Sequence, residues 1–254
     1  MEKIRKPFQG IFNIFRFNWH FYLMSVALIF LILLFNLIFK TPYQLFGYLA
    51  IFLIFINTLI SLLVSYYVYD LSDLYKLNWL DKLAILPNSK MLNINAGFDE
   101  TSILLKEKYP EQELIVFDFY DPIKHTELSL KRARKAYPPF PGTQQISYYH
   151  FPLPENYADH IFVVLSAHEI RSESERIIFF KELNRILKQN GKIVVIEHLK
   201  DLQNFLAYNI GFFHFVSKSS WYAAFKISNL KTVLEIKITP FITTFILEKN
   251  GTES

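Results

Sequence analysis

Two long runs without a charged residue dominate the first part of the chain. Residues 21–39 contain none over 19 positions, and residues 45–67 contain none over 23. At ~1.5 Å per residue, helices of these lengths reach roughly 28 and 34 Å, enough to cross a bilayer core of about 30 Å. Residues 40–43 separate the runs. The pattern predicts two transmembrane helices joined by a short turn, with a buried hairpin inside a soluble core as the alternative.

The segment before the first run has a helical period. Its apolar positions recur every three or four residues from Phe8 to Trp19, and Pro7 stands where a helix can begin. This pattern predicts a short amphipathic helix in the membrane interface. Four basic residues precede the first run, so the positive-inside rule places the N-terminus in the cytoplasm. Two spans would return the chain to the cytoplasmic side.

From residue 90 onward, strand-like and helix-like patterns alternate, after a linker helix expected over residues 70–90. Strands are predicted at 91–95, 114–118, 146–149, 161–165, 192–197, 230–238 and 242–248. Helices are predicted at 100–108, 127–136, 172–189 and 219–229, the third ending at Asn190-Gly191. Such alternation predicts an α/β fold with a doubly wound, mostly parallel, seven-stranded sheet over residues 91–254. Residues 1–69 then form the membrane part.

Charge and cysteine content narrow the function. The net charge of +4 comes from the basic N-terminus and Lys40, so residues 70–254 carry no net charge. A nucleic-acid-binding domain would need clustered basic residues on its own surface, so nucleic acid is not an expected partner. The chain has no cysteine, which excludes disulfides, thiolate metal sites and cysteine nucleophiles.

Polar residues follow three of the predicted strands. They lie in the segments 93–100, 116–118 and 165–171. In an open α/β sheet, ligands bind beyond the carboxyl ends of the strands. The three segments are therefore the candidate site.

Several motifs of this region resemble the class I S-adenosylmethionine-dependent methyltransferases. The most specific are a helix ending in E-L-x-R-I-L-K-x-x-G-K over residues 182–192, the apolar strand that follows it, and the acidic strand end at Asp118. Tyr69-Asp70 and Leu74-Tyr75 ahead of Trp79-Leu80 also match the segment before that family's cofactor loop. The resemblance runs from about Tyr75 to the C-terminus. It implies a Rossmann-like fold, methyl-transfer activity and S-adenosylmethionine as the cofactor.

The cofactor loop departs from the family pattern. The family has an acidic residue and three glycines at alternate positions, where this chain has Asn93, Asn95, Gly97 and Asp99. Asn95 tolerates a left-handed turn, and Asp99 can cap the next helix. The resemblance implies that Asp118 accepts hydrogen bonds from the ribose hydroxyls and that residues 144–150 reach the adenine. The expected cofactor-binding residues are Asn93, Asn95, Ala96, Gly97, Asp118, Phe119, Phe151 and Ser166.

His168 and Glu169 follow the fourth strand, where the methyl acceptor is expected. Methyl transfer is an in-line displacement that requires positioning and exclusion of water. With a hydroxyl or phenol acceptor, His168 is a candidate base, and His198 and His214 are secondary candidates. The H-E pair is not a metal motif, because Ser172 stands at the second histidine position. No metal site is expected.

The sequence thus predicts a membrane-anchored methyltransferase with its catalytic domain on the cytoplasmic face and an apolar acceptor such as a quinone precursor, isoprenoid or lipid. The aromatic segment 205–215 lines the acceptor pocket, dips into the membrane surface or packs as a lid. One rival is a non-catalytic membrane scaffold that retains the fold. The other is a nicotinamide-dependent oxidoreductase, whose G-x-G-x-x-G loop would lack two of its three glycines here.

Overall fold

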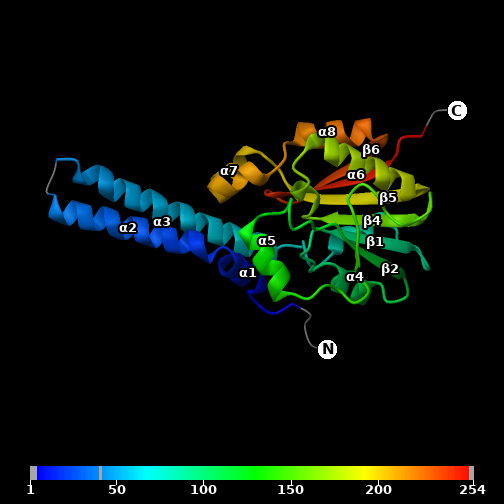
Figure 1. Cartoon of the computed structure of the whole chain (residues 1–254), viewed down its shortest axis with the longest axis horizontal. Helices are drawn as coiled ribbons and strands as arrows, with labels where there is room; N and C mark the ends of the chain where they lie inside the picture. The colour runs from blue at the N-terminus through cyan, green and yellow to red at the C-terminus, as the bar shows by residue number, and fades with distance from the viewer. Residues whose placement is uncertain (1–4, 40–41, 252–254) are drawn as a thin grey trace.

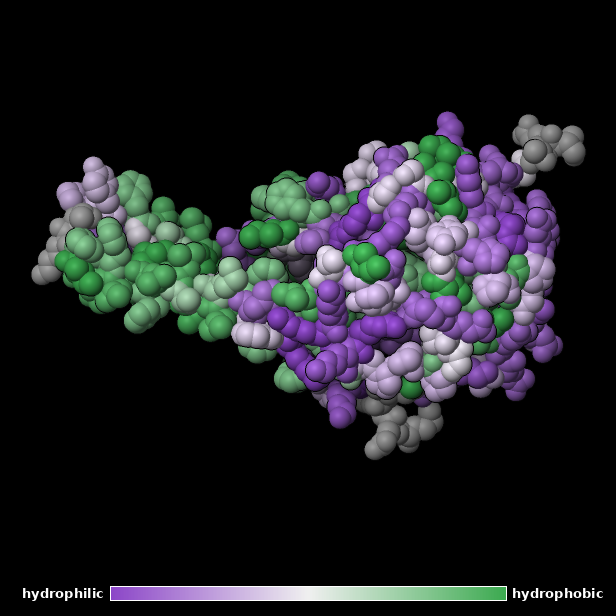
Figure 2. Space-filling view, in the orientation of Figure 1, coloured by the Kyte–Doolittle hydropathy of each residue, from purple (hydrophilic) through white to green (hydrophobic). Residues whose placement is uncertain are grey.

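The computed structural model describes residues 5–39 and 42–251, and it has two parts. Helices α2 (Trp19–Ile38) and α3 (Gln44–Tyr66) pack together as a hairpin that projects from an α/β domain (Figure 1). Both are long and apolar enough to cross a membrane, and almost none of their apolar windows is buried. Their surface is mostly apolar, except at the tip of the hairpin (Figure 2). The hairpin is therefore no core element of a soluble domain; residues 40 and 41 of the predicted turn lie outside the described residues.

The predicted amphipathic helix is present as α1 (Gln9–Phe17), and it is fixed to the end of α3. Helix α3 continues into one π-helical turn, η1 (Tyr67–Leu71). The two carboxylate oxygens of Asp70 in this turn accept hydrogen bonds from the amides of Gly10 and Ile11, both at 2.8 Å. A Cβ on Gly10 would lie 2.5 Å from the Cβ of Tyr69, so only glycine permits this approach. A carboxylate at a helix N-terminus satisfies amides that lack intrahelical partners.

The linker over residues 70–90 is not the single helix that the leucine spacing predicted. It contains a short 3₁₀ helix, η2 (Asn78–Leu83), between Leu77 and Ala84, which both have positive φ. Left-handed residues interrupt the helical hydrogen-bond ladder. The interruption lets Trp79, Leu80 and Leu83 turn into the core. Tertiary packing therefore overrides local helical spacing here.

The domain is built on one seven-stranded sheet with the strand order β3-β2-β1-β4-β5-β7-β6. The strands are β1 (Lys90–Asn95), β2 (Glu113–Asp118), β3 (Gln144–Gln145), β4 (Ala158–Val164), β5 (Leu187–His198), β6 (Leu230–Thr239) and β7 (Ile242–Lys249). Strand β7 runs antiparallel to both neighbours, and the other pairs are parallel. The predicted doubly wound, mostly parallel sheet is confirmed.

Helices cover both faces of the sheet (Figure 1). The helices of the domain are α4 (Ser102–Lys108), α5 (Leu128–Ala136), α6 (Glu173–Ile186), α7 (Leu202–Tyr208) and α8 (Lys218–Ile227), with short turns η3 (Ala167–Glu169) and η4 (Asn209–His214). Rings from α6 and α8 fill one side of the core, while η2 and α4 cover the other. Each side excludes water from the central strands, which explains their continuous apolar sequences.

Two element boundaries differ from the sequence prediction. Helix α6 ends at Ile186, and strand β5 already begins at Leu187, so Gly191 lies within a strand instead of ending a helix. A Cβ on Gly191 would lie 3.0 Å from the carbonyl oxygens of Ala158 and Asp159, so β5 approaches β4 closely at this glycine. The third strand is also shorter and earlier than predicted, because only residues 144–145 pair with β2.

Candidate functional site

The carboxyl ends of the parallel strands face the end of the hairpin that joins the α/β domain (Figure 1). After β1, the ring of Phe98 packs edge-on against Phe17 of α1, with ring centroids 5.8 Å apart. At the end of β5, His198 Nε2 lies 2.8 Å from the hydroxyl of Tyr69 in η1. Ligand sites of open α/β sheets lie at this edge. The candidate site is therefore adjacent to the surface from which the apolar hairpin projects.

The loop after β1 makes a tight turn. Asn95 Oδ1 accepts a hydrogen bond from the Gly97 amide at 2.9 Å, and Gly97 has a φ of 95°. Asn95, which stands where the family has its first glycine, thus closes the turn with its own side chain. The remaining glycine occupies the left-handed position, where a side chain would be strained.

Asp99, which stands where the family has its last glycine, is held behind this turn by several hydrogen bonds. Its Oδ1 accepts the amides of Thr101 and Ser102 at 2.9 Å and the Asn93 side-chain amide at 3.2 Å. Its Oδ2 is buried and has no hydrogen-bond partner among the residues that the structure describes. A buried carboxylate oxygen without a donor is costly, so this atom is suited to a cationic or hydrogen-bonding ligand.

A small cavity of about 20 Å³ lies at this edge of the sheet. It is lined by Asn95, Gly97, Asp99, Asp118, Arg134, Tyr137, Pro138 and Pro139. Asp118 is almost fully buried at the end of β2; its Oδ1 accepts the Tyr120 amide, and its Oδ2 forms an ion pair with Arg134. The Arg134 guanidinium also lies against Gly97, 2.9 Å from where a Cβ would be. Arg134 therefore closes the cavity from the α5 side.

The structure brings only part of the expected cofactor set to this cavity. Asn95, Gly97 and Asp118 line it, and Asn93 lies behind it, bonded to Asp99. Ala96, Phe119 and Phe151 belong to the hydrophobic core, and Ser166 donates a hydrogen bond to the carbonyl of Ile94 at 2.9 Å. Arg134 is a site residue that the sequence did not predict, because its contact with Asp118 spans 16 positions of the chain.

Helix α1 is tied to the β1 loop by Glu100. Glu100 Oε1 accepts hydrogen bonds from Arg5 at 2.6 Å and from the side chain of Gln9 at 2.8 Å, while Oε2 accepts one from Tyr75 at 3.1 Å. On the other side of the cavity, the Tyr137 hydroxyl donates to Asn13 of α1 at 2.9 Å. The helix predicted to lie in the membrane interface thus contacts the β1 loop at Glu100 and the cavity lining at Tyr137.

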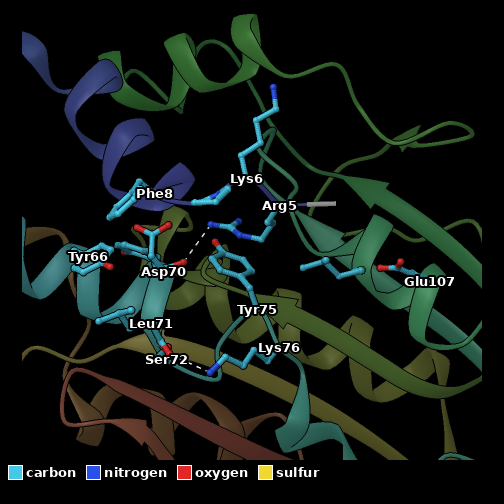
Figure 3. Close-up of a pocket in the computed structure, with 13 residues that line it drawn as sticks. Arg5, Lys6, Phe8, Tyr66, Asp70, Leu71, Ser72, Tyr75, Lys76 and Glu107 are labelled. Carbon is cyan, nitrogen blue, oxygen red and sulfur yellow. Dashed lines mark hydrogen bonds between the residues drawn. The ribbon is translucent and has the colours of Figure 1, made fainter. Parts of the chain in front are cut away.

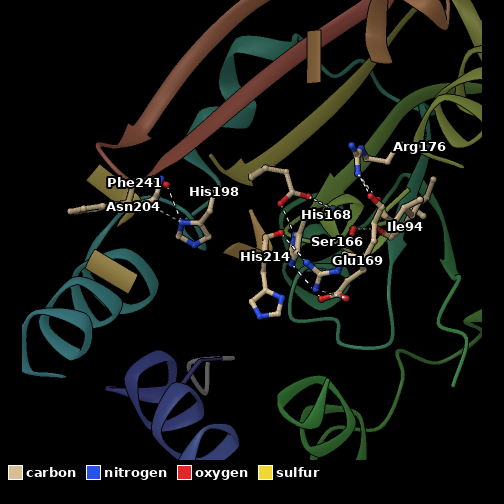
Figure 4. Close-up of polar contacts among 12 residues, drawn as sticks. Ile94, Ser166, His168, Glu169, Arg176, His198, Asn204, His214 and Phe241 are labelled. Carbon is tan, nitrogen blue, oxygen red and sulfur yellow. Dashed lines mark hydrogen bonds and ion pairs between the residues drawn. The ribbon is translucent and has the colours of Figure 1, made fainter. Parts of the chain in front are cut away.

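His168 lies between two carboxylates (Figure 4). Its Nδ1 is 2.7 Å from Glu197 Oε2, and its Nε2 is 3.4 Å from Glu169 Oε1. Burial alone would lower the pKa of His168, but these carboxylates raise it to about 10. Burial would raise the pKa of Glu169, whereas hydrogen bonding to His168 and the nearby positive charges lower it to about 2. At neutral pH the imidazole is protonated, so this arrangement favours a fixed positive charge over the base role considered for His168.

The two secondary histidines also have defined partners. His198 Nδ1 donates to the carbonyl of Phe241 at 3.0 Å, which leaves Nε2 to accept the hydrogen bond from Tyr69. Burial lowers the pKa of His198 to about 4, so it is neutral. His214 Nδ1 is 2.6 Å from Glu127 on the surface. In the described ranges no cluster of three potential metal ligands is found.

A larger cavity of about 580 Å³ lies between residues 5–8, which precede α1, the turn η1 and helix α4 (Figure 3). It shares no lining residue with the cavity at Asp118. In it, Arg5 stacks on the ring of Tyr75 at 3.7 Å while paired with Glu100. The larger cavity lies away from the ends of β1 and β2. The smaller cavity is therefore the better candidate for the cofactor.

Comparison with known proteins agrees with this geometry. A family model described as a methyltransferase domain matches residues 97–195, which contain the β1 loop, Asp118 and His168. No curated protein sequence matches the chain significantly. A SAM-dependent methyltransferase from Aquifex aeolicus has a TM-score of 0.52 and 15% identity, covering 75% of this chain and 97% of that chain.

A second solved structure, the PH0226 protein from Pyrococcus horikoshii OT3, is similar with a TM-score of 0.50 and 15% identity, covering 68% of this chain and 89% of that chain. At these identities the likeness shows the fold. The family model supplies the chemical class. Together they identify a methyltransferase domain with an α/β fold in this chain.

Proposed function

We propose that the chain is a membrane-anchored methyltransferase that transfers a methyl group to an apolar or lipid-phase small molecule at the cytoplasmic face of a membrane. The observation that carries this proposal is the orientation of the sheet: the edge that holds the cavity faces α1 and the base of the apolar hairpin. Anchoring would keep the site beside the bilayer and raise the local concentration of an acceptor dissolved in it.

The residues at the cavity have the hydrogen-bonding groups and the charge that S-adenosylmethionine requires. The Asp118 carboxylate at the end of β2 has two acceptor oxygens, as a ribose requires, and the one paired with Arg134 becomes available when that arginine moves. The free Oδ2 of Asp99 suits the ammonium of the methionine part and would replace the acid absent at Asn93. Gly97 has no side chain that would block the approach of a ligand to the loop backbone once Arg134 has moved. A cavity of about 20 Å³ is too small for the cofactor, so Arg134 and residues 137–139 would have to move to admit it.

The bound cofactor supplies an electrophilic methyl group on a sulfonium. The protein would hold this group in line with the acceptor and exclude water, with α1 and Tyr137 covering the site. His168 and Glu169 would act on the acceptor side as fixed charges that orient it. An acceptor hydroxyl would then release its proton to bulk water as the product leaves the site.

Replacing Arg134 by alanine is expected to raise the affinity for S-adenosylhomocysteine by about 10- to 100-fold. The ligand would no longer have to break a charge-assisted hydrogen bond to Asp118, which is worth roughly 1.5–3 kcal/mol. Calorimetric titration measures the change. Lys135→Ala, on the exposed side of α5, is the control and should leave the affinity unchanged. A weaker affinity in Arg134→Ala would show that this arginine holds the cofactor instead of excluding it.

The cofactor part of the proposal is tested by titrating detergent-purified full-length protein with S-adenosylmethionine, S-adenosylhomocysteine and NADH. We expect saturable binding of the first two only, weakened about 10- to 100-fold by Asp118→Ala, which removes the ribose acceptor. Circular dichroism checks that the variant is folded. Binding of NADH alone would favour the oxidoreductase, and binding of no ligand by folded protein would favour a non-catalytic scaffold.

The acceptor part is tested with methyl-labelled S-adenosylmethionine and the full chain in lipid nanodiscs supplied with a membrane lipid extract. Label is expected in the organic-soluble fraction and should be absent with the Asp118→Ala variant. Label appearing only in water-soluble products would contradict an apolar acceptor while leaving the methyltransferase assignment intact.

A further inference from the structure

The segment from α7 to η4, residues 202–214, packs on the hairpin through one narrow face. Asn204 and Ala207 are buried, and α7 contacts α3. Asn204 Oδ1 lies 3.1 Å from His198 Nδ1, and Asp201 accepts the Asn204 amide at 3.0 Å as the N-cap of α7. The segment is therefore held in place by the end of β5 and by the hairpin, with a defined inner and outer face.

The outer face of this segment is apolar and exposed. Its large side chains have exposed fractions between 44 and 72%. They are Leu202, Phe205, Leu206, Ile210 and Phe213. Residues 202–213 contain no charged side chain, and the ammonium of Lys200 lies 5.7 Å from the Phe213 ring centre. Ordinary lid packing would bury these side chains, so the exposure shows that the segment does not serve as a packed lid here.

Helix α1 likewise has one face packed on the hairpin and an exposed apolar outer face. It also contacts α3, and it exposes Phe8, Phe12 and Phe15, followed by Trp19 at the start of α2. Figure 1 shows α1 and α7 at the same end of the domain, next to the base of the hairpin, and Figure 2 shows apolar surface over the α7 region close to the apolar hairpin. The two exposed faces thus continue the apolar surface of α2 and α3.

We infer that residues 202–214 form a second interfacial element, which lies in the headgroup region of the lipid bilayer beside α1. This inference rests on the proposed membrane anchoring. An uncharged, aromatic-rich helical face with a cation at its edge is typical of segments that lie in the bilayer interface. The continuity of this face with the hairpin makes the bilayer its occupant. Because η4 ends at His214, whose carbonyl accepts a hydrogen bond from Arg171 at 2.9 Å, the same element would bring the bilayer to the acceptor side of the site.

The inference is tested by fluorescence of full-length protein in nanodiscs made with lipids brominated at shallow or deep acyl positions. Phe205→Trp places a reporter on the outer face. Leu28→Trp, in the middle of α2, reports the hairpin, and Leu86→Trp, exposed at the opposite edge of the sheet, is the aqueous control. The emission added by each variant is compared with that of the parent chain, which has its own tryptophans.

We expect the emission at position 205 to fall about twofold with shallow bromines and less with deep ones. Position 28 should be quenched most by deep bromines, and position 86 by neither. Quenching at 28 without quenching at 205 would overturn the inference and leave the anchoring intact. Quenching at neither position would overturn both. A blue-shifted but unquenched tryptophan at 205 would show that a protein surface covers the segment, which also overturns the inference.

Discussion

Replacing Glu197 by glutamine is expected to lower the free energy of unfolding by about 3–5 kcal/mol at neutral pH. Glu197 is fully buried, and its two oxygens contact Nδ1 of His168 at 2.7 Å and the His168 amide at 3.2 Å. Glutamine keeps the shape but removes the charge that compensates the imidazolium. The histidine must then lose its proton or remain charged with only Glu169 nearby. Denaturant titration of the full-length protein in detergent measures the loss.

The difference in unfolding free energy between wild type and Glu197→Gln depends on pH in a defined direction. The pKa of His168 is raised from 6.5 to about 10, so its contribution to stability is complete below about pH 6.5 and is lost as the pH rises towards 10. The pKa of Glu169 is lowered from 4.5 to about 2, so its contribution is lost as the pH falls from 4.5 towards 2. The stability difference between wild type and Glu197→Gln should therefore be largest between about pH 4.5 and 6.5 and shrink towards pH 10.

Glu127 provides the matched control. It is also paired with a histidine and an arginine, His214 and Arg171, but its side chain is 29% exposed. A solvent-accessible pair contributes about 0–1 kcal/mol, so Glu127→Gln should cost less than 1 kcal/mol. Equal losses in the two variants, or no pH dependence of the difference, would show that Glu197 does not hold a charged histidine.

Replacing Asp99 by asparagine is expected to weaken S-adenosylhomocysteine binding by about 10- to 100-fold and to leave the affinity for 5′-methylthioadenosine unchanged. The first ligand carries an amino-acid ammonium and the second does not. Asparagine keeps the acceptor that bonds the Thr101 and Ser102 amides, so the loop is retained. What is lost is the charge on Oδ2, and a hydrogen bond to a charged group is worth roughly 1.5–3 kcal/mol. Calorimetry with both ligands measures the difference.

The neighbouring Asn93 allows a sharper control. Its side-chain amide bonds Asp99 Oδ1 at 3.2 Å, so the double variant Asn93→Asp with Asp99→Asn exchanges the two groups across one hydrogen bond. This exchange should restore most of the preference for the ligand with an ammonium. If Asp99→Asn weakens both ligands equally, Asp99 shapes the loop and does not contact the ammonium. If wild type binds neither ligand, the cofactor assignment itself fails.

The sequence predictions succeeded where the information is local. Charge exclusion over residues 21–39 and 45–67 required no knowledge of the rest of the chain, and both runs are helices. The apolar runs that became β1, β2, β4, β5 and β7 are central strands covered on both faces. The helix expected over residues 70–90 was wrong, because leucines at helical spacing there are used to fill the core from a broken segment. Gly191 was misassigned for a similar reason: its role depends on the approach of β4.

By itself, the sequence determined the fold class, the apolar hairpin, the amphipathic α1 and the strand ends that carry the site, since each follows from periodicity, charge and turn chemistry within a short window. Only the tertiary structure decided which charged groups pair at the site and which remain without a partner. Arg134 pairs with Asp118 across 16 positions of the chain, and Glu197 stabilises the protonated His168 across 29. Among the residues that the structure describes, one oxygen of Asp99 has no hydrogen-bond partner. Such properties arise when distant segments bury charges together, and burial is set by the whole fold.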